Sequence, residues 1–296
     1  MKPAPFDYQA PGSVSEVLAL LAEHGDDAKV LAGGQSLVPM LNMRLTRPRV
    51  LISLRRLREL DFVRRQNGSL AVGSMTRQAA LESSADVRQV CPLVADATRF
   101  VGHPTIRNRG TVGGSIAHAD PAAELPAVLV ALDGRVALAS RRGSRSVAAT
   151  DFFKGLMATE ARPDELITDI LFHAVGAAQD RRGHGFEEVS RRHGDFALAG
   201  VAVALALDAS TRVTDARIAL LGVEARPRRC TRAEGALVGQ PWRGERLAEI
   251  AELAAEGLDP LADYHASGEF RVHLTKVLAR RALAAAYERA SGGGRS

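Results

Sequence analysis

The chain has 296 residues, of which 46% are hydrophobic, 25% charged and 4% aromatic, and its formal net charge is +5. This composition is ordinary for a globular protein with one large domain or two to three modest ones. The densest basic cluster, within residues 226–232, has no aromatic platform beside it, which disfavours nucleic-acid binding. No apolar run is long enough for a transmembrane helix, and residues 1–7 lack a signal-peptide core, so we expect a cytoplasmic protein.

The N-terminal residues predict a small α/β lobe. Ser13 to Glu16 match a capping box, and apolar residues follow at helical spacing until Gly25 ends the helix. A glycine pair follows the first expected strand, at the end where open α/β units bind ligands. After the first helix, the elements expected in residues 1–55 are strands at 29–31 and 50–54 and a short helix at 37–42.

The middle of the chain predicts a hairpin, then helices, then further strands. Gln66-Asn67-Gly68-Ser69 separates two apolar runs, and Asn-Gly is the strongest short hairpin signal. Residues 101–110 are too polar and too rich in Gly and Pro for a regular element. The other expected elements are helices at 76–83, 92–99 and 124–131, strands at 135–139 and 165–171, and a turn at 141–144.

The composition becomes small and polar over residues 174–184, which predicts a domain boundary. Three strands, enough for a small antiparallel sheet, should follow at 185–190, 197–207 and 213–220. Helices are expected at 231–238, 245–256 and 269–289. The predicted domains are 1–175 with lobes 1–55 and 56–175, then 176–290, then a flexible tail at 291–296.

Two glycine pairs share one pattern. Leu31-Ala32-Gly33-Gly34-Gln35-Ser36-Leu37 and the stretch from Thr111 to Pro121 each read as an apolar strand end, a Gly-Gly turn, polar side chains and a helix. Such turns expose backbone N–H groups with no Cβ in the way, and a helix N-terminus adds partial positive charge. We therefore expect the two loops to hold the two phosphates of one dinucleotide. Neither loop has the Rossmann or P-loop spacing.

Other polar residues near these loops have less specific patterns. His118, Asp120 and Glu124 lack metal-ligand spacing, and we expect them to bind a polar ligand or to cap the following helix. Arg107 and Arg109 fit either a phosphate contact or a brace for their own loop, and the sequence favours neither.

The candidate nucleophiles are also unconvincing. Ser36 and Ser115 lack the Gly-x-Ser-x-Gly elbow of hydrolases. The two cysteines, Cys91 and Cys230, cannot ligate an iron–sulfur cluster by themselves, and we expect buried, idle thiols.

Taken together, the motifs resemble a known family. The segments Ala32 to Ser36, Ile106 to Ser115 and Ala119-Asp120-Pro121 look like the FAD-binding medium subunit of the molybdenum hydroxylases, the carbon monoxide dehydrogenase and xanthine dehydrogenase family. The run from Phe186 to Arg192, followed by Gly194-Asp195-Phe196-Ala197, resembles the start of that family's C-terminal domain. The resemblance covers nearly the whole chain in order.

This resemblance implies an α+β fold. The family has a two-lobed PCMH-type FAD-binding domain of the vanillyl-alcohol-oxidase kind, followed by a carbon monoxide dehydrogenase flavoprotein C-terminal-like domain with a three-stranded antiparallel sheet and helices. It also implies cofactor contacts but no catalytic residue and no metal ligand in this chain. The residues matching the family's FAD contacts are Leu31, Ala32, Gly33, Gly34, Gln35, Ser36, Leu37, Val101, Gly102, Ile106, Gly110, Thr111, Gly113, Gly114, Ser115, Asp120, Glu124, Ile167 and Phe196.

Two positions depart from the family pattern. Gln35 stands where a histidine is frequent in the carbon monoxide dehydrogenase branch, and because both side chains can donate a hydrogen bond, FAD binding should survive. Glu187-Glu188 occupies a segment where relatives often carry a lysine near the cofactor, which puts the identity of the electron acceptor in doubt.

The implied function is electron transfer within a larger oxidoreductase complex. A large molybdopterin subunit would oxidise the substrate, a small subunit with two [2Fe–2S] clusters would relay electrons, and FAD in this chain would pass them to an external acceptor. The expected assembly is a dimer of heterotrimers. Two alternatives are a self-contained FAD-dependent oxidase and a non-catalytic nucleotide-binding or assembly module.

Overall fold

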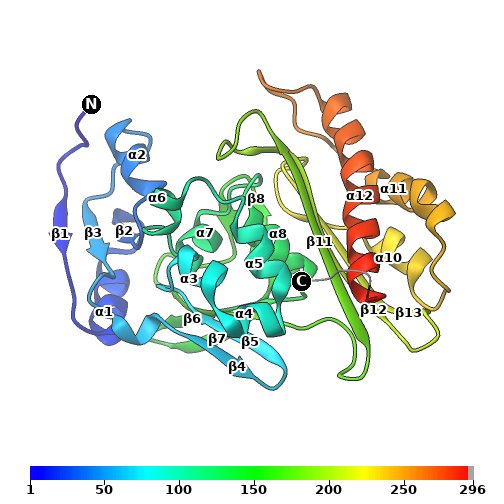
Figure 1. The fold of residues 1–296 in the computed structure, drawn as a ribbon. Helices are drawn as coiled ribbons and strands as arrows, with labels where there is room; N and C mark the ends of the chain where they lie inside the picture. The colour runs from blue at the N-terminus through cyan, green and yellow to red at the C-terminus, as the bar shows by residue number, and fades with distance from the viewer. Residues whose placement is uncertain (293–296) are drawn as a thin grey trace.

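The computed structural model describes residues 1–292 and contains both helices and sheets (Figure 1). Three units follow one another along the chain: a small N-terminal unit, a central unit and a C-terminal unit. In the part of the chain that is described, no helix is both long and apolar enough to cross a membrane. Of the predicted tail, residues 293–296 lie outside the described residues.

The N-terminal unit is a parallel sheet of order β1-β3-β2 with one helix packed against it. The Ser13 hydroxyl accepts the Glu16 N–H, as the capping box predicts, and Gly25 ends α1 at a φ of +50°. The core is formed by Val17 and Ile52, which are fully buried. The elements are β1 (Asp7–Gln9), α1 (Val14–His24), β2 (Ala28–Leu31), α2 (Leu37–Asn42) and β3 (Val50–Ser53), with β1 not predicted.

The central unit has a five-stranded antiparallel sheet of order β4-β5-β10-β6-β7, with helices packed on one face (Figure 1). Asn67 and Gly68 both have positive φ, which the tight hairpin turn requires. The strands are β4 (Val63–Gln66), β5 (Ser69–Gly73), β6 (Arg135–Ser140), β7 (Gly143–Ala148) and β10 (Leu166–Phe172), with a small pair β8 (Phe153–Gly155) and β9 (Ala158–Thr159). The helices are α3 (Gln78–Ser83), α4 (Ala85–Val90), α5 (Pro92–Thr98), α6 (Pro104–Arg107), α7 (Val112–His118), α8 (Glu124–Ala131) and α9 (Ala149–Phe152).

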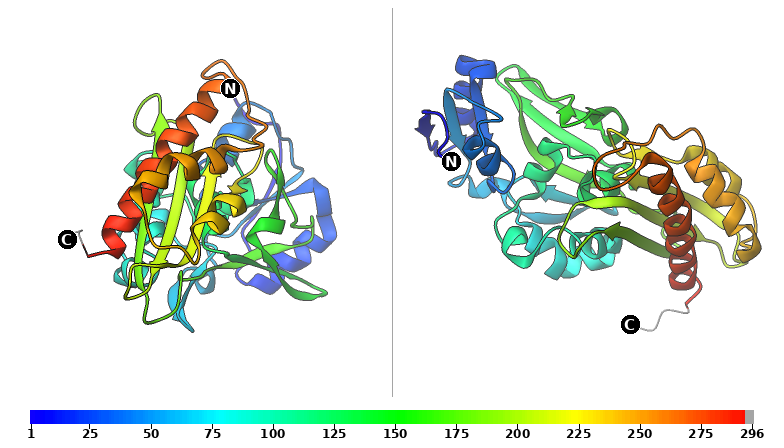
Figure 2. Two further views of the ribbon diagram at one scale, coloured as in Figure 1. Left: turned by 90° about the vertical axis from the view of Figure 1, so that its right-hand side faces the viewer. Right: turned by 90° about the horizontal axis from the view of Figure 1, so that it is seen from above.

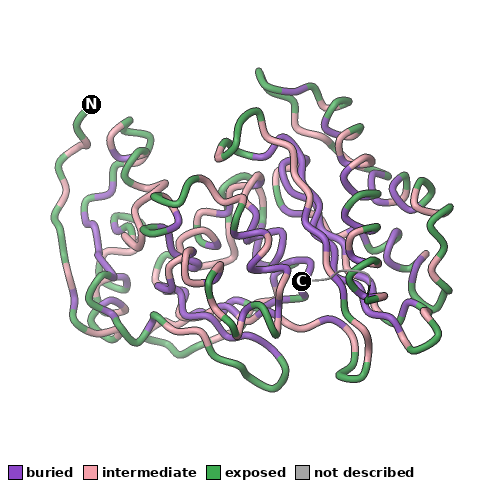
Figure 3. Tube along the Cα trace, viewed as in Figure 1, coloured by how far each residue is buried: buried purple, intermediate pink, exposed green. Residues whose placement is uncertain are grey.

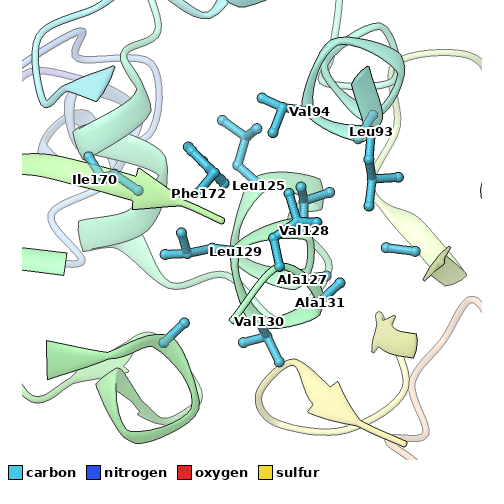
Figure 4. Close-up of a cluster of buried hydrophobic side chains, with 14 of the residues drawn as sticks. Leu93, Val94, Leu125, Ala127, Val128, Leu129, Val130, Ala131, Ile170 and Phe172 are labelled. Atoms are coloured by element: carbon cyan, nitrogen blue, oxygen red, sulfur yellow. The ribbon is translucent and has the colours of Figure 1, made fainter. Parts of the chain in front are cut away.

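Helix α8 is the centre of the core. All eight of its residues are buried and are therefore coloured purple in Figure 3. Its side chains reach Ile170 and Phe172 on β10 in one direction and Leu93 and Val94 on α5 in the other (Figure 4). The apolar side chains of α8 thus pack between the central sheet and α5.

The C-terminal unit is an antiparallel sheet covered by a long helix, which crosses the strands in Figure 2. Added Cβ atoms on Gly183 and Gly185 would overlap the backbone of α12, so these glycines allow the close packing. The predicted three long strands are confirmed, but the sheet has a short fourth strand that was not predicted. The elements are β11 (Arg181–Ser190), β12 (Ala197–Leu207), β13 (Val213–Leu221), β14 (Arg228–Arg229), α10 (Thr231–Leu237), α11 (Leu247–Ala255) and α12 (Gly268–Ala290).

Three predictions about the central unit were wrong. The loop expected over 101–110 contains the short helix α6, which begins at Pro104, the favoured first helical position. The second glycine pair lies inside helix α7 and not in a turn. The turn expected over 141–144 is shorter, because β7 already begins at Gly143.

Candidate functional site

The two glycine-containing loops meet at one cleft of about 700 Å³. The loop after β2, the start of α7 and the loop between β11 and β12 all contribute to its wall. Its size is within the range typical of cofactor sites. The structure thus brings residues of both loops to one cleft.

The first loop presents free backbone donors to this cleft. Gly34 has a φ of +75°, which allows the chain to turn sharply between β2 and α2. Within the described residues, the four amide groups from Gly33 to Ser36 donate to no protein acceptor. The Gln35 side chain donates to the Gly33 carbonyl oxygen at 3.2 Å and so braces the loop from within. Four consecutive free amides form a site suited to an anion.

The second loop was expected to expose free backbone N–H groups, but its structure is different. Thr111 caps α7, and its hydroxyl accepts the Gly114 N–H at 3.1 Å. The Val112 N–H donates to Thr76 O at 3.0 Å, and the Gly113 N–H donates to Ser74 O at 2.9 Å. The amides of the first helical turn are thus occupied by protein acceptors, so this glycine pair does not present free donors.

The glycines of the second loop serve close packing instead. A Cβ on Gly113 would lie 2.5 Å from the Ser74 Cβ, and one on Gly114 would lie 2.8 Å from the Thr111 hydroxyl oxygen. A side chain at Gly113 would push α7 away from the end of β5, and one at Gly114 would disturb the Thr111 cap. Ser115, which follows the glycine pair, also lines the cleft.

Arg107 braces the segment before α6. Its side chain is 8% exposed, and its guanidinium pairs with Glu82 at 3.0 Å and donates to the carbonyl oxygens of Val101 and Gly102 at 3.2 Å each. Of the two roles left open by the sequence, the structure shows the brace. Val101 and Gly102 themselves line the cleft, as does Ile106.

Two carboxylates with unusual surroundings lie at or beside the cleft. Burial raises the pKa of Glu124, at the start of α8, to about 7, and the nearby Asp120 adds to this effect. Burial also raises the pKa of Glu188 on β11 to about 8, with a further contribution from Glu124. One oxygen of Glu188 is enclosed without a hydrogen-bond partner. This part of the site therefore favours protonated carboxyl groups near neutral pH.

Most of the predicted contacts converge on the cleft. Phe196 is 68% exposed at its rim, and Ile167 on β10 lines its wall. Leu31 and Gly110 do not line the cleft, and Gly110 is buried against the Gln78 side chain. The other predicted contacts on its surface are Ala32, Gly33, Gly34, Gln35, Ser36, Leu37, Thr111, Gly113, Gly114, Ser115, Asp120 and Glu124.

Several lining residues were not predicted. Ser74 reaches the cleft from the segment after β5 and Gln78 from the start of α3, and Gly194 and Asp195 reach it beside Phe196. The segment around β9, from Met157 to Leu166, forms another side. Gly194 and Asp195 belong to a segment that resembles the family but were not predicted as contacts, and no motif marks the others, because their position depends on contacts between parts of the chain far apart in sequence.

The cysteines lie outside this site. Cys91 and Cys230 are both buried, and burial raises the pKa of each thiol to about 12. The prediction that these thiols are buried is confirmed.

Comparisons with known proteins agree with this architecture. The family model for the FAD binding domain in molybdopterin dehydrogenase matches residues 4–172, and the model for the CO dehydrogenase flavoprotein C-terminal domain matches residues 184–286. The chain is 41% identical to the 6-hydroxypseudooxynicotine dehydrogenase complex subunit alpha of Paenarthrobacter nicotinovorans, over 98% of this chain and 97% of that relative.

Solved structures extend the similarity to the whole fold. A chain of carbon monoxide dehydrogenase from Hydrogenophaga pseudoflava, in a form lacking the Mo-pyranopterin moiety, superposes with a TM-score of 0.93 at 37% identity, covering 98% of this chain and 99% of that one. A chain of quinoline 2-oxidoreductase from Pseudomonas putida 86 superposes with a TM-score of 0.91 at 38% identity, with the same coverage. The chain therefore belongs to the family of FAD-binding flavoprotein subunits of the molybdenum hydroxylases.

Proposed function

We propose that this chain binds FAD in the cleft and acts as the electron-transferring flavoprotein subunit of a molybdenum hydroxylase. The observation that carries the proposal is the row of four free amides from Gly33 to Ser36, set against α7 in a cleft of about 700 Å³. Free amides and a glycine-lined cradle suit a pyrophosphate, since they offer donors without steric hindrance.

The two loops would contribute different groups to cofactor binding. The first loop supplies backbone donors to the pyrophosphate. The second supplies the Ser115 hydroxyl and a close-packed wall, because its own amides are already bonded to Thr76 and Ser74. Ile167 would offer an apolar contact, and Phe196, exposed at the rim, would cover an aromatic ring system.

The acidic residues would lie near the flavin end. Glu124 and Asp120 line the cleft, and a protonated Glu124 can donate a hydrogen bond where an ionised one cannot. When bound, FAD supplies the redox chemistry, while this chain binds and orients it and tunes its surroundings. We assign no general acid, no general base and no nucleophile to the chain.

The wider role follows from family membership. The names of two relatives identify them as parts of larger enzymes. They are the carbon monoxide dehydrogenase medium chain and the subunit alpha of the 6-hydroxypseudooxynicotine dehydrogenase complex. We propose that this chain likewise receives electrons from the [2Fe–2S] clusters of a small subunit and passes them to an external acceptor. A large molybdopterin subunit would choose and oxidise the substrate, and two heterotrimers would form the complex.

The domain organisation belongs to the same proposal. We assign residues 1–175 to a two-lobed PCMH-type FAD-binding domain and residues 176–290 to the C-terminal domain. The two lobes would be the N-terminal unit and the central unit, and residues of both units line the cleft.

Purification with native partners tests this function. The chain, tagged in its native host, should bring down two further subunits, and the material should contain flavin, iron and molybdenum. Flavin in a lone chain that turns over a substrate would favour a self-contained oxidase. A colourless lone chain that does not take up added FAD would overturn the proposal.

A further inference from the structure

The buried guanidinium of Arg271 joins two strands at the end of the C-terminal sheet. Arg271 lies in the first turn of α12 and is 4% exposed. Its Nη1 donates to the carbonyl oxygens of Leu198 at 2.5 Å and Gly222 at 2.7 Å. Its Nη2 donates to the Asp263 carboxylate at 2.7 Å. One side chain thus fastens the start of β12, the end of β13 and the segment before α12.

Gly222 connects this point to the cleft. Its N–H donates to the Pro121 carbonyl oxygen at 2.8 Å, and Pro121 directly follows Asp120. Its φ is +74°, and an added Cβ would lie 2.8 Å from the Ala197 carbonyl oxygen. Ala197 directly follows Phe196. The backbone of Gly222 is therefore wedged between the two segments that carry Asp120 and Phe196 to the cleft.

These two segments come from different units. Asp120 and Glu124 belong to the central unit, whereas Gly194 to Phe196 belong to the loop between β11 and β12. Their separation depends on how the ends of β12 and β13 sit against Pro121. If the guanidinium were removed, two buried carbonyl oxygens would lose their charged donor, which favours a shift of both strand ends.

We propose that Arg271 is a positioning residue that fixes the separation between the Asp120 and Phe196 segments and so sets how tightly FAD is held. The inference rests on the proposed FAD site. Arg271 does not line the cleft, so its effect passes through Leu198 and Gly222. Its role differs from that of Arg107, which lies in the central unit and braces the segment of Val101 and Gly102.

To test this inference, the full-length chain is freed of flavin and titrated with FAD, and binding is measured by flavin fluorescence. The variants are Arg271→Gln and Arg271→Lys, with Arg280→Gln as the matched control, because Arg280 is an exposed residue of the same helix. Arg271→Gln should raise the dissociation constant for FAD by about tenfold or more and speed its release. Arg271→Lys should give a smaller rise, since an ammonium group cannot span three acceptors in the same fork geometry. The control should stay within about twofold of the wild type.

A coupling experiment separates positioning from a general loss of fold. If Arg271 acts through the segment that carries Phe196, Arg271→Gln should weaken FAD binding less in a Phe196→Ala chain than in the wild-type chain. Its effect should be additive with that of Ile167→Ala. Far-UV circular dichroism checks that each variant is folded, and if Arg271→Gln does not fold, Arg271→Lys decides the question. Folded Arg271 variants with wild-type FAD affinity, or additivity with Phe196→Ala, would overturn the inference. A wild-type chain that binds no FAD would instead overturn the proposed site and this inference with it.

Discussion

Gly33 and Arg109 approach each other so closely that no side chain fits between them. A Cβ added to Gly33 would overlap the Arg109 carbonyl oxygen and lie 2.9 Å from the Gly110 Cα. The two residues are far apart in sequence, and their contact joins the first loop to the segment that leads into α7. This contact places the free amides of the first loop opposite the wall formed by α7.

Gly33→Ala should therefore disrupt the cleft. The methyl group would have to displace backbone, so we expect a loss of about 1–3 kcal/mol in the free energy of unfolding and at least a tenfold weaker affinity for FAD. Urea unfolding and FAD titration measure the two effects. Gly12→Ala is the matched control, because a Cβ on Gly12 meets nothing within 4 Å. Equal FAD affinities for the two variants would contradict the assigned role of Gly33.

Arg107→Gln should destabilise the central unit. The substitution leaves the Glu82 carboxylate and the carbonyl oxygens of Val101 and Gly102 without their charged donor, which should cost about 2–4 kcal/mol. Arg109→Gln, two residues away and exposed, should change stability by less than about 0.5 kcal/mol. Chemical unfolding of both variants checks the difference. If the two variants were equally stable, the bracing role of Arg107 would be wrong.

Glu188 should make the folded chain less stable as the pH rises. Its pKa is about 8 in the folded chain against 4.5 for an ordinary glutamate, so between these values the folded state binds more protons than the unfolded state. The free energy of unfolding therefore falls as pH rises from about 4.5 to 8 through this group. Glu188→Gln should be more stable than the wild type by about 1–3 kcal/mol at pH 8.5, with a smaller difference at pH 5.5. Urea unfolding at the two pH values measures this, and an unchanged pH dependence would contradict it.

Glu124 should make FAD binding depend on pH. The pyrophosphate is negatively charged, and an ionised Glu124 in the same cleft repels it, whereas a protonated one does not. Because the pKa of Glu124 is about 7, the dissociation constant for FAD should rise between pH 6 and 8.5. The expected change is about three- to tenfold in the wild type and much less in Glu124→Gln. Parallel pH profiles for the two proteins would exclude Glu124 as the cause.

The sequence predicted the elements that carry strong local signals. The bounds of α2 and α8 agree with the prediction, because each is a short, mainly apolar run. The hairpin at Asn67-Gly68 agrees as well, since that turn requires two positive φ values. By contrast, β1 has three exposed residues and no alternation, so only its pairing with β3 defines it.

The sequence indicated both loops of the cleft but not how they are built. The glycine pairs marked both loops, yet a glycine that exposes an amide and a glycine that avoids a clash look the same in a sequence. Both Gly33 and Gly113 avoid a clash with a residue far away in the sequence, Arg109 and Ser74 respectively, but within the described chain only the Gly113 amide is bonded, to the Ser74 carbonyl oxygen. The roles of Arg107 and Arg271 depend in the same way on carbonyl oxygens from other segments.

The central claim, that the cleft of this chain holds FAD, is tested most directly by titrating the flavin-free, full-length wild-type chain with FAD. Binding of one FAD for each chain, lost or strongly weakened in Gly33→Ala and kept in Gly12→Ala, is the predicted result. A folded wild-type chain that takes up no FAD, or a Gly33→Ala variant that binds it as tightly as the wild type, would contradict the claim.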